Sequence, residues 1–407
     1  MARKWMLGTF VLLFVTSVLG LLMRYVVFSH SPILPFIHIL HAHSHLALLG
    51  FGFLFVLGSY LFTSSSRPLN FPGFYKMGVG YIIASVFMAI SFIYQSYGPI
   101  SIAFSTVLML MAYLMIYKFR RSLANSNKSE FNPFIPWSMN WFVISTIGIW
   151  ILGPTSAILG KTHDLYFLSI QFFLHFQFNG WFVYVVLGLL YSGGFLHTKW
   201  NHSSRQGLNL INIGLVLTYF LSVTYLNKHP IFFLLNAIGS VLQIWGFCLI
   251  LFPVLRGTIP SRPNIQWARW MIYFGVACLA TKVLLQGIAA IPSLTEVAYS
   301  IREFIVGFIH LILLGGMTIT ISGLLTEAGI LPQNKLSAIG WWGLMVTIFI
   351  TEVTLFGHGI TTWMGLGNSW MFVRVIFLAT IPFPIFIAMI VAGIWRNRVE
   401  PHSIRNT

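Results

Sequence analysis

Twelve long apolar stretches occupy most of the 407-residue chain, with only short polar segments between them. Each stretch has about the 20 residues that a helix needs to cross the hydrocarbon core of a bilayer. Charged residues make up 7% of the sequence, against roughly 25% in soluble domains. The sequence therefore predicts an all-α polytopic membrane protein and excludes a soluble enzyme. The expected spans are 5–28, 33–62, 77–97, 99–119, 136–159, 165–192, 207–226, 231–255, 267–291, 301–326, 337–358 and 370–395.

Lysine and arginine residues divide unequally between the two sides of this bundle. With the N-terminus on one side, 17 of the 23 fall on that side and four on the other, while Lys282 and Arg374 lie within spans. Loops rich in these residues face the cytoplasm. We therefore expect both termini in the cytoplasm of a bacterium and the chain in its inner membrane. The net charge of +16 then reflects contact with anionic lipid head groups rather than with nucleic acid.

Three spans share one local pattern, a His followed by four residues and a Gly. The pattern begins at His45, His175 and His310, which lie in the second, sixth and tenth spans. A recurrence every four helices predicts a single transmembrane domain whose twelve helices form three pseudo-threefold arcs. The Gly leaves space beside its helix for a flat macrocycle or for a neighbouring helix. The expected domain covers residues 1–407, with repeat units of about 1–130, 131–265 and 266–407.

Histidine is also concentrated at the start of the second span. On a helix, His38, His41 and His45 share one stripe, whereas His43 points to another side. A histidine inside a membrane is costly, and it is either satisfied by a neighbour or functional. Neutral imidazole is a common ligand of haem iron and copper. One helix could thus serve two sites, and the alternative for His38 and His41 is a position in the wet interface.

With these motifs the chain resembles subunit I of the haem–copper oxidases, which is built from three four-helix arcs. The segment HSHLALLGFG (43–52) is similar to the helix-2 haem motif of C-type oxidases, in which the ligand His precedes G-F-G by seven residues, as His43 does here. The segment FIHLILLGGM (308–317) is similar to the helix-10 pattern, where His310 matches the low-spin haem ligand. HAHSHLALLGF, LHFQFNGWF and KVLLQGIAAIP also look like segments of bacterial oxidase-related membrane proteins.

This resemblance implies a low-spin haem b with His43 and His310 as its two axial ligands. It does not extend to the oxygen-reducing centre. Phe308 stands where the family has the ligand of its high-spin haem, and Asn179 where it has a cross-linked Tyr. The span 207–226, which matches the copper-binding helix, contains no His. Copper remains a second metal to consider, and its candidate ligands are His45, His175 and His358.

Several other polar residues lie inside the predicted spans, and each needs a partner there. Lys282 and Gln286 are one helical turn apart, and Glu352 lies in the eleventh span. One interpretation makes such groups a proton path, and the other pairs Lys282 with Glu352 as a link between helices. Arg374 and Arg302 are candidate anchors for haem propionates, because guanidinium binds carboxylate through two hydrogen bonds.

These observations leave three functions open. The first is a haem-binding membrane protein that transfers electrons or handles a small gas such as O2 or NO. The second is an oxidoreductase-like respiratory enzyme with an atypical centre at His45, His175 and His358. The third is a transporter with histidines as proton relays, although transporters usually have twofold repeats. The expected partners are the lipid bilayer and a cytochrome or quinol as electron donor, and no pattern sets the oligomeric state.

Overall fold

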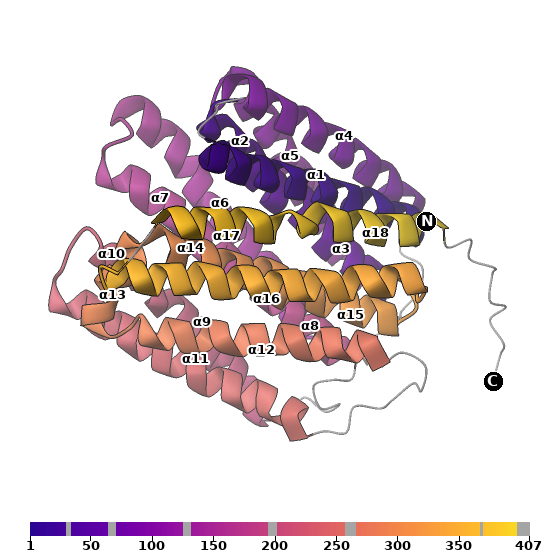
Figure 1. Ribbon diagram of the computed structural model, residues 1–407. Coiled ribbons are helices and arrows are strands. Elements are labelled where there is room, and N and C mark those ends of the chain that lie inside the picture. The colour runs from indigo at the N-terminus through magenta and orange to yellow at the C-terminus, as the bar shows by residue number, and fades with distance from the viewer. Residues whose placement is uncertain are drawn as a thin grey trace. The chain divides into compact units, whose positions relative to one another are not determined.

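A computed structural model describes residues 1–29, 34–63, 71–124, 132–193, 202–256, 266–366 and 369–396, with backbone only for 71–72, 252–256 and 369. Every regular element in these ranges is a helix, and Figure 1 shows their course. The α-helices of the first half are α1 Ala2–Ser29, α2 Phe36–His45, α3 Phe53–Thr63, α4 Phe71–Gln95, α5 Pro99–Ala124, α6 Phe134–Ile158, α7 Asp164–His175 and α8 Val183–Ser192.

The second half of the chain continues in the same way. Its α-helices are α9 His202–Thr218, α10 Phe220–Thr224, α11 Pro230–Arg256, α12 Gln266–Ile288, α13 Pro292–Ser300, α14 Arg302–His310, α15 Thr320–Glu327, α16 Lys335–Trp363, α17 Ser369–Thr380 and α18 Pro382–Arg396. Three π-helices complete the set, namely η1 Leu46–Gly52, η3 Phe176–Phe182 and η4 Leu311–Ile319.

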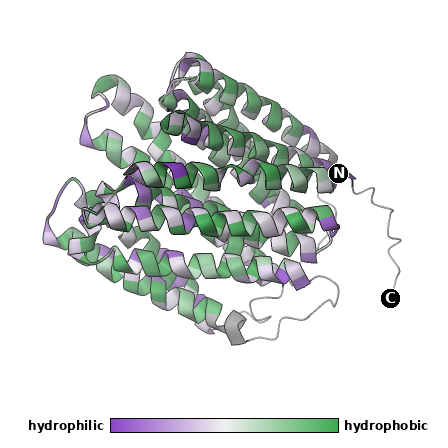
Figure 2. Cartoon of the chain, viewed as in Figure 1, coloured by the Kyte–Doolittle hydropathy of each residue, from purple (hydrophilic) through white to green (hydrophobic). Residues whose placement is uncertain are grey.

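The predicted fold class is confirmed. Twelve helices in the described ranges are long and apolar enough to cross a membrane, and each coincides with one expected span. The helices are apolar along their length, and hydrophilic residues gather near their ends (Figure 2). The boundaries match because an apolar run without water must satisfy its backbone groups internally, which a helix does.

The chain divides into two compact units. Unit 1 comprises Met1–Ala124, Leu325–Thr351 and Trp370–Thr407, and unit 2 comprises Asn125–Leu324 and Glu352–Ser369. The predicted grouping into three four-helix repeats stays a prediction.

In unit 1, α1 packs against α2, η1 and α18. The indole of Trp5 lies between Gly58 and Gly78 and donates a 3.0 Å hydrogen bond to the Leu54 carbonyl oxygen. Because neither glycine has a Cβ, the large Trp5 side chain of α1 fits against both α3 and α4 and connects the three helices.

In unit 2, α9 and α11 are in very close contact. A Cβ on Gly214 would lie 2.6 Å from the carbonyl oxygen of Gly239, and a Cβ on Gly207 would lie 3.0 Å from that of Gly246. Small residues at both positions therefore allow the two backbones to approach, as is common between membrane helices.

The helix count gives a prediction about topology. Lys128 and Lys161 lie on either side of α6, so reporter domains fused at these positions should report opposite sides of the membrane. Lys128 itself is outside the described residues. A cytoplasmic reporter such as β-galactosidase should be active at Lys128, and a periplasmic one such as alkaline phosphatase at Lys161. The same reporter active at both sites would show that α6 does not cross.

Candidate functional site

The three histidines of the repeated pattern share one local structure. His45, His175 and His310 are the last residues of α2, α7 and α14, and each is followed at once by a π-helix. The π-helices η1, η3 and η4 begin at the next residue. Because π-helical turns are rare and occur often at functional positions, their recurrence at the same register singles out these three places.

The glycines of the pattern are sites of close helix packing. A Cβ on Gly180 would lie 2.8 Å from the Cβ of Trp141 on α6, and a Cβ on Gly315 would lie 2.5 Å from the Sγ of Cys278 on α12. Of the two expected uses of this space, a macrocycle or a neighbouring helix, these two glycines take the second. At Gly50 the nearest atom of another helix is the Cβ of Ser85, at 3.5 Å.

His43 lies against α1. Its Nδ1 donates a 2.9 Å hydrogen bond to the carbonyl oxygen of Thr16, since a carbonyl can only accept. The proton on Nδ1 leaves Nε2 with a lone pair, and no hydrogen bond to Nε2 is present in the described part of the chain. Gly20 makes room for the ring, because a Cβ there would lie 3.0 Å from the Cε1 atom.

His45 faces the opposite way, toward α4 and the turn after it. Its Nδ1 donates to the carbonyl oxygen of His41 at 3.0 Å, and its Nε2 accepts from the hydroxyl of Tyr97 at 3.1 Å. The ring also lies 4.2 Å from that of Phe92. Both nitrogens are therefore engaged by the protein itself. Sequence reasoning missed Tyr97, because hydropathy does not determine which residue of a turn meets a given helix.

The stripe expected for His38, His41 and His45 is present. His38 Nδ1 lies 2.9 Å from the carbonyl oxygen of Ile93, and His41 Nδ1 lies 2.9 Å from the hydroxyl of Ser96. These groups belong to the end of α4 and the turn that follows, whereas His43 faces α1. The helix thus presents its histidines to two different neighbours, as the spacing predicts.

His175 in unit 2 is also satisfied within the chain. Its Nε2 donates to the carbonyl oxygen of Leu215 at 2.9 Å, and its Nδ1 is 3.5 Å from the side-chain amide nitrogen of Asn179. Asn179, which the sequence resemblance sets against the cross-linked Tyr of the oxidases, is here a hydrogen-bond partner of the histidine.

His358 lies near the C-terminal end of α16 and is paired with an acid. Its Nδ1 is 3.5 Å from a carboxylate oxygen of Glu303, and both side chains are largely buried. Glu303 was not predicted, although an acidic residue in a chain with only seven such residues is itself a signal. No three His, Cys, Asp or Glu side chains among the described residues lie close enough to hold a metal ion.

The buried polar residues of unit 2 do not pair as one interpretation expected. Lys282 is fully buried and donates a 2.7 Å hydrogen bond to Gln286, one turn along α12. Neither carboxylate oxygen of Glu352 has a hydrogen-bond partner among the described residues. The expected link between Lys282 and Glu352 was therefore wrong, because Lys282 finds its partner within its own helix.

The two arginines differ in their surroundings. Arg374 on α17 is exposed, and its guanidinium carbon lies 5.1 Å from the centre of the Trp370 ring. Arg302 is exposed at the first position of α14, in the unit that also contains His310.

No family model matches this chain, and no curated protein matches it. Among solved structures it is similar to a haem–copper terminal oxidase that was determined as a dimer, with a TM-score of 0.67 and 13% sequence identity. The match covers 100% of this chain and 85% of that one. The fold is oxidase-like.

An oxidase-like fold confirms, in its coarser form, the resemblance that the motifs indicated. At 13% identity the similarity concerns the course of the chain and not its cofactors. Any proposal that this oxidase-like protein binds haem or copper therefore rests on the chain's own residues.

Proposed function

We propose that this oxidase-like membrane protein binds one low-spin haem b through His43 and His310 and transfers electrons. The observation that carries the proposal is the hydrogen bond from His43 Nδ1 to the Thr16 carbonyl oxygen. A ligating histidine almost always donates its second ring N–H to a carbonyl or carboxylate, which fixes the tautomer and the ring plane. His43 has this arrangement, and its Nε2 lone pair is the one that would face iron.

The alternative ligand on the same helix fits less well. The two nitrogens of His45 are held by His41 and Tyr97, so ligation would require at least one of these hydrogen bonds to break. The internal repeat places His45 in line with His310, whereas the family spacing favours His43. The hydrogen bonds support His43.

The chain's own residues limit what the bound group would do. A bis-imidazole haem supplies one-electron transfer and has no open coordination position. Phe308 replaces the ligand of an oxygen-binding haem, and His175 is bonded to Leu215 and Asn179. Together they favour electron transfer over oxygen reduction. Copper at His45, His175 or His358 would need these side chains to exchange their present partners.

The remaining assignments follow from this proposal. Arg302 and Arg374 would bind the haem propionates, and a cytochrome or a quinol would be the electron donor. The protein would act in the inner membrane of a bacterium, with both termini in the cytoplasm, as its Lys and Arg distribution favours.

One observation favours a second function, the movement of protons through the membrane by a transporter. Glu352 is 7% exposed, and both of its oxygens lack a partner among the described residues. Such a carboxylate inside a membrane must be neutralised by a proton or a cation. A colourless protein that acidifies vesicles would support this alternative.

The two forms of the haem proposal, electron transfer and gas handling, can be separated with carbon monoxide. If both axial positions are filled by imidazole, CO should leave the spectrum of the dithionite-reduced protein unchanged. A shifted Soret band would show an open iron position, which supports gas handling and contradicts bis-imidazole ligation.

A further inference from the structure

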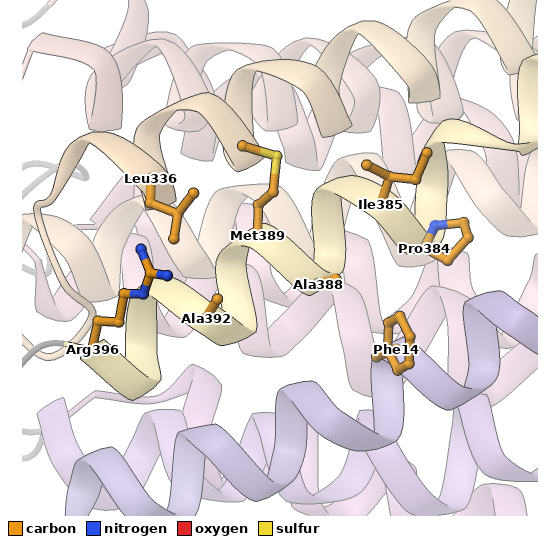
Figure 3. Close-up of a pocket in the computed structure, with 8 residues that line it drawn as sticks. All are labelled: Phe14, Leu336, Pro384, Ile385, Ala388, Met389, Ala392 and Arg396. Atoms are coloured by element: carbon orange, nitrogen blue, oxygen red, sulfur yellow. The ribbon is translucent and has the colours of Figure 1, made fainter.

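An apolar groove of about 630 Å³ runs along one side of α18 in unit 1. Pro384, Ala388, Ala392 and Arg396 are spaced by four residues and so form one stripe of the helix. Because two of the four are alanines, the stripe stands lower than the neighbouring row of the same helix, which carries Ile385 and Met389. Phe14 of α1 and Leu336 of α16 line the same groove (Figure 3).

The dimensions of the groove match one leaflet of a bilayer. Pro384 is at the middle of the span Trp370–Arg396, and Arg396 is its last residue. Twelve residues of helix between them rise about 18 Å, and one leaflet contributes roughly 15 Å of hydrocarbon. The groove thus extends from the bilayer centre to the level of the head groups, and Arg396 lies at its head-group end.

Positive charges from distant parts of the sequence meet at the Arg396 end. Arg3 donates a 2.9 Å hydrogen bond to the carbonyl oxygen of Ile394, and also one to that of Trp395. Asn334 donates to the carbonyl oxygen of Gly393 at 3.0 Å, which brings the start of α16 and its exposed Lys335 to the same end. In the described residues of unit 1, Glu327 is the only acidic residue.

We propose that this groove binds one anionic phospholipid, with an acyl chain along Ala388 and Ala392 and the phosphate beside Arg396. Arg396 is exposed and makes no hydrogen bond or ion pair within the described residues, so its guanidinium is available to a phosphate. The charge distribution also predicts that this end faces the cytoplasm, where the leaflet is rich in anionic lipid. This proposal is independent of haem binding.

Native mass spectrometry of the delipidated protein with added phosphatidylglycerol or phosphatidylcholine tests this site. The wild type should bind the first phosphatidylglycerol more tightly than phosphatidylcholine. Arg396→Gln should weaken phosphatidylglycerol binding about fivefold, the factor expected for one basic residue near a lipid surface. Ala388→Phe should fill the groove and abolish the tight site. Two changes on the exposed face of α5, Arg121→Gln and Ala103→Phe, are matched controls that should leave it intact.

Three outcomes would overturn the proposal. One is equal affinity of the wild type for the two lipids. Another is an Arg396→Gln effect no larger than that of Arg121→Gln. The third is conversion of a dimer to a monomer by Ala388→Phe in light scattering, which would make the groove a contact between two copies of the chain. Only variants whose melting temperature equals that of the wild type are compared, so that a loss of fold is not taken for a loss of lipid binding.

Discussion

His43→Ala should remove the low-spin haem b signal from the purified protein, whereas His45→Ala should leave most of it. The reason is that His43 has an Nε2 lone pair set by the hydrogen bond to Thr16, while both nitrogens of His45 are engaged by His41 and Tyr97. Loss of the group that hydrogen-bonds to a ligating histidine typically lowers metal affinity by roughly tenfold or more. Loss of the ligand itself should therefore lower haem occupancy by at least roughly tenfold. His310→Ala should have the same effect as His43→Ala.

The measurement is the reduced-minus-oxidised spectrum of the three variants at matched expression and matched elution volume. His43→Ala and His310→Ala should lose the sharp α-band of a six-coordinate iron. Haem lost in His45→Ala but kept in His43→Ala would reverse the assignment. Haem kept in all three variants would place the ligands elsewhere, and the similarity to the oxidases would then concern the fold alone.

Alanine at Gly180 or Gly315 should destabilise the protein by about 1–3 kcal/mol, the usual cost of overpacking a close contact. A Cβ at these positions would meet Trp141 and Cys278 at 2.8 Å and 2.5 Å. Because both glycines lie in the π-helices that follow His175 and His310, the same change should disturb the geometry of these histidines.

Gly357→Ala is the matched control for these two variants. Gly357 lies in the same unit, inside α16, and nothing is within 4 Å of the Cβ that it would gain. Alanine there should stabilise the helix by up to about 1 kcal/mol, because glycine is the poorer helix former. Unfolding in mild detergent, followed by tryptophan fluorescence, compares the three. A loss at Gly357 equal to that at Gly180 and Gly315 would show that the contacts of the π-helices are not special.

The fold could be predicted from hydropathy because the bilayer leaves the backbone few choices. A run such as 99–119 has no charged residue until Lys118, so a helix is its only stable form in a membrane. The histidine stripe of α2 followed in the same way from helical spacing. The hydrogen bond between Lys282 and Gln286 could also be predicted from helical spacing, because the two residues are one turn apart.

The π-helices could not be predicted, since the wider turn after His45, His175 and His310 depends on packing. The four residues between His and Gly differ, from LALL in the first repeat to FQFN in the second. Contacts between spans could not be predicted from the sequence, for a related reason. Hydropathy places Glu303, Tyr97 and Glu352 at a depth but does not say what each one faces.

The haem b content of the purified wild-type protein tests the proposed ligation most directly. The protein would be produced in cells supplied with a haem precursor, and its pyridine haemochrome absorbance would be divided by a protein concentration from amino-acid analysis. One haem b per chain, with a six-coordinate low-spin spectrum in both oxidation states, is the expected result. A folded, monodisperse and colourless protein from these cells would contradict haem binding by His43 and His310.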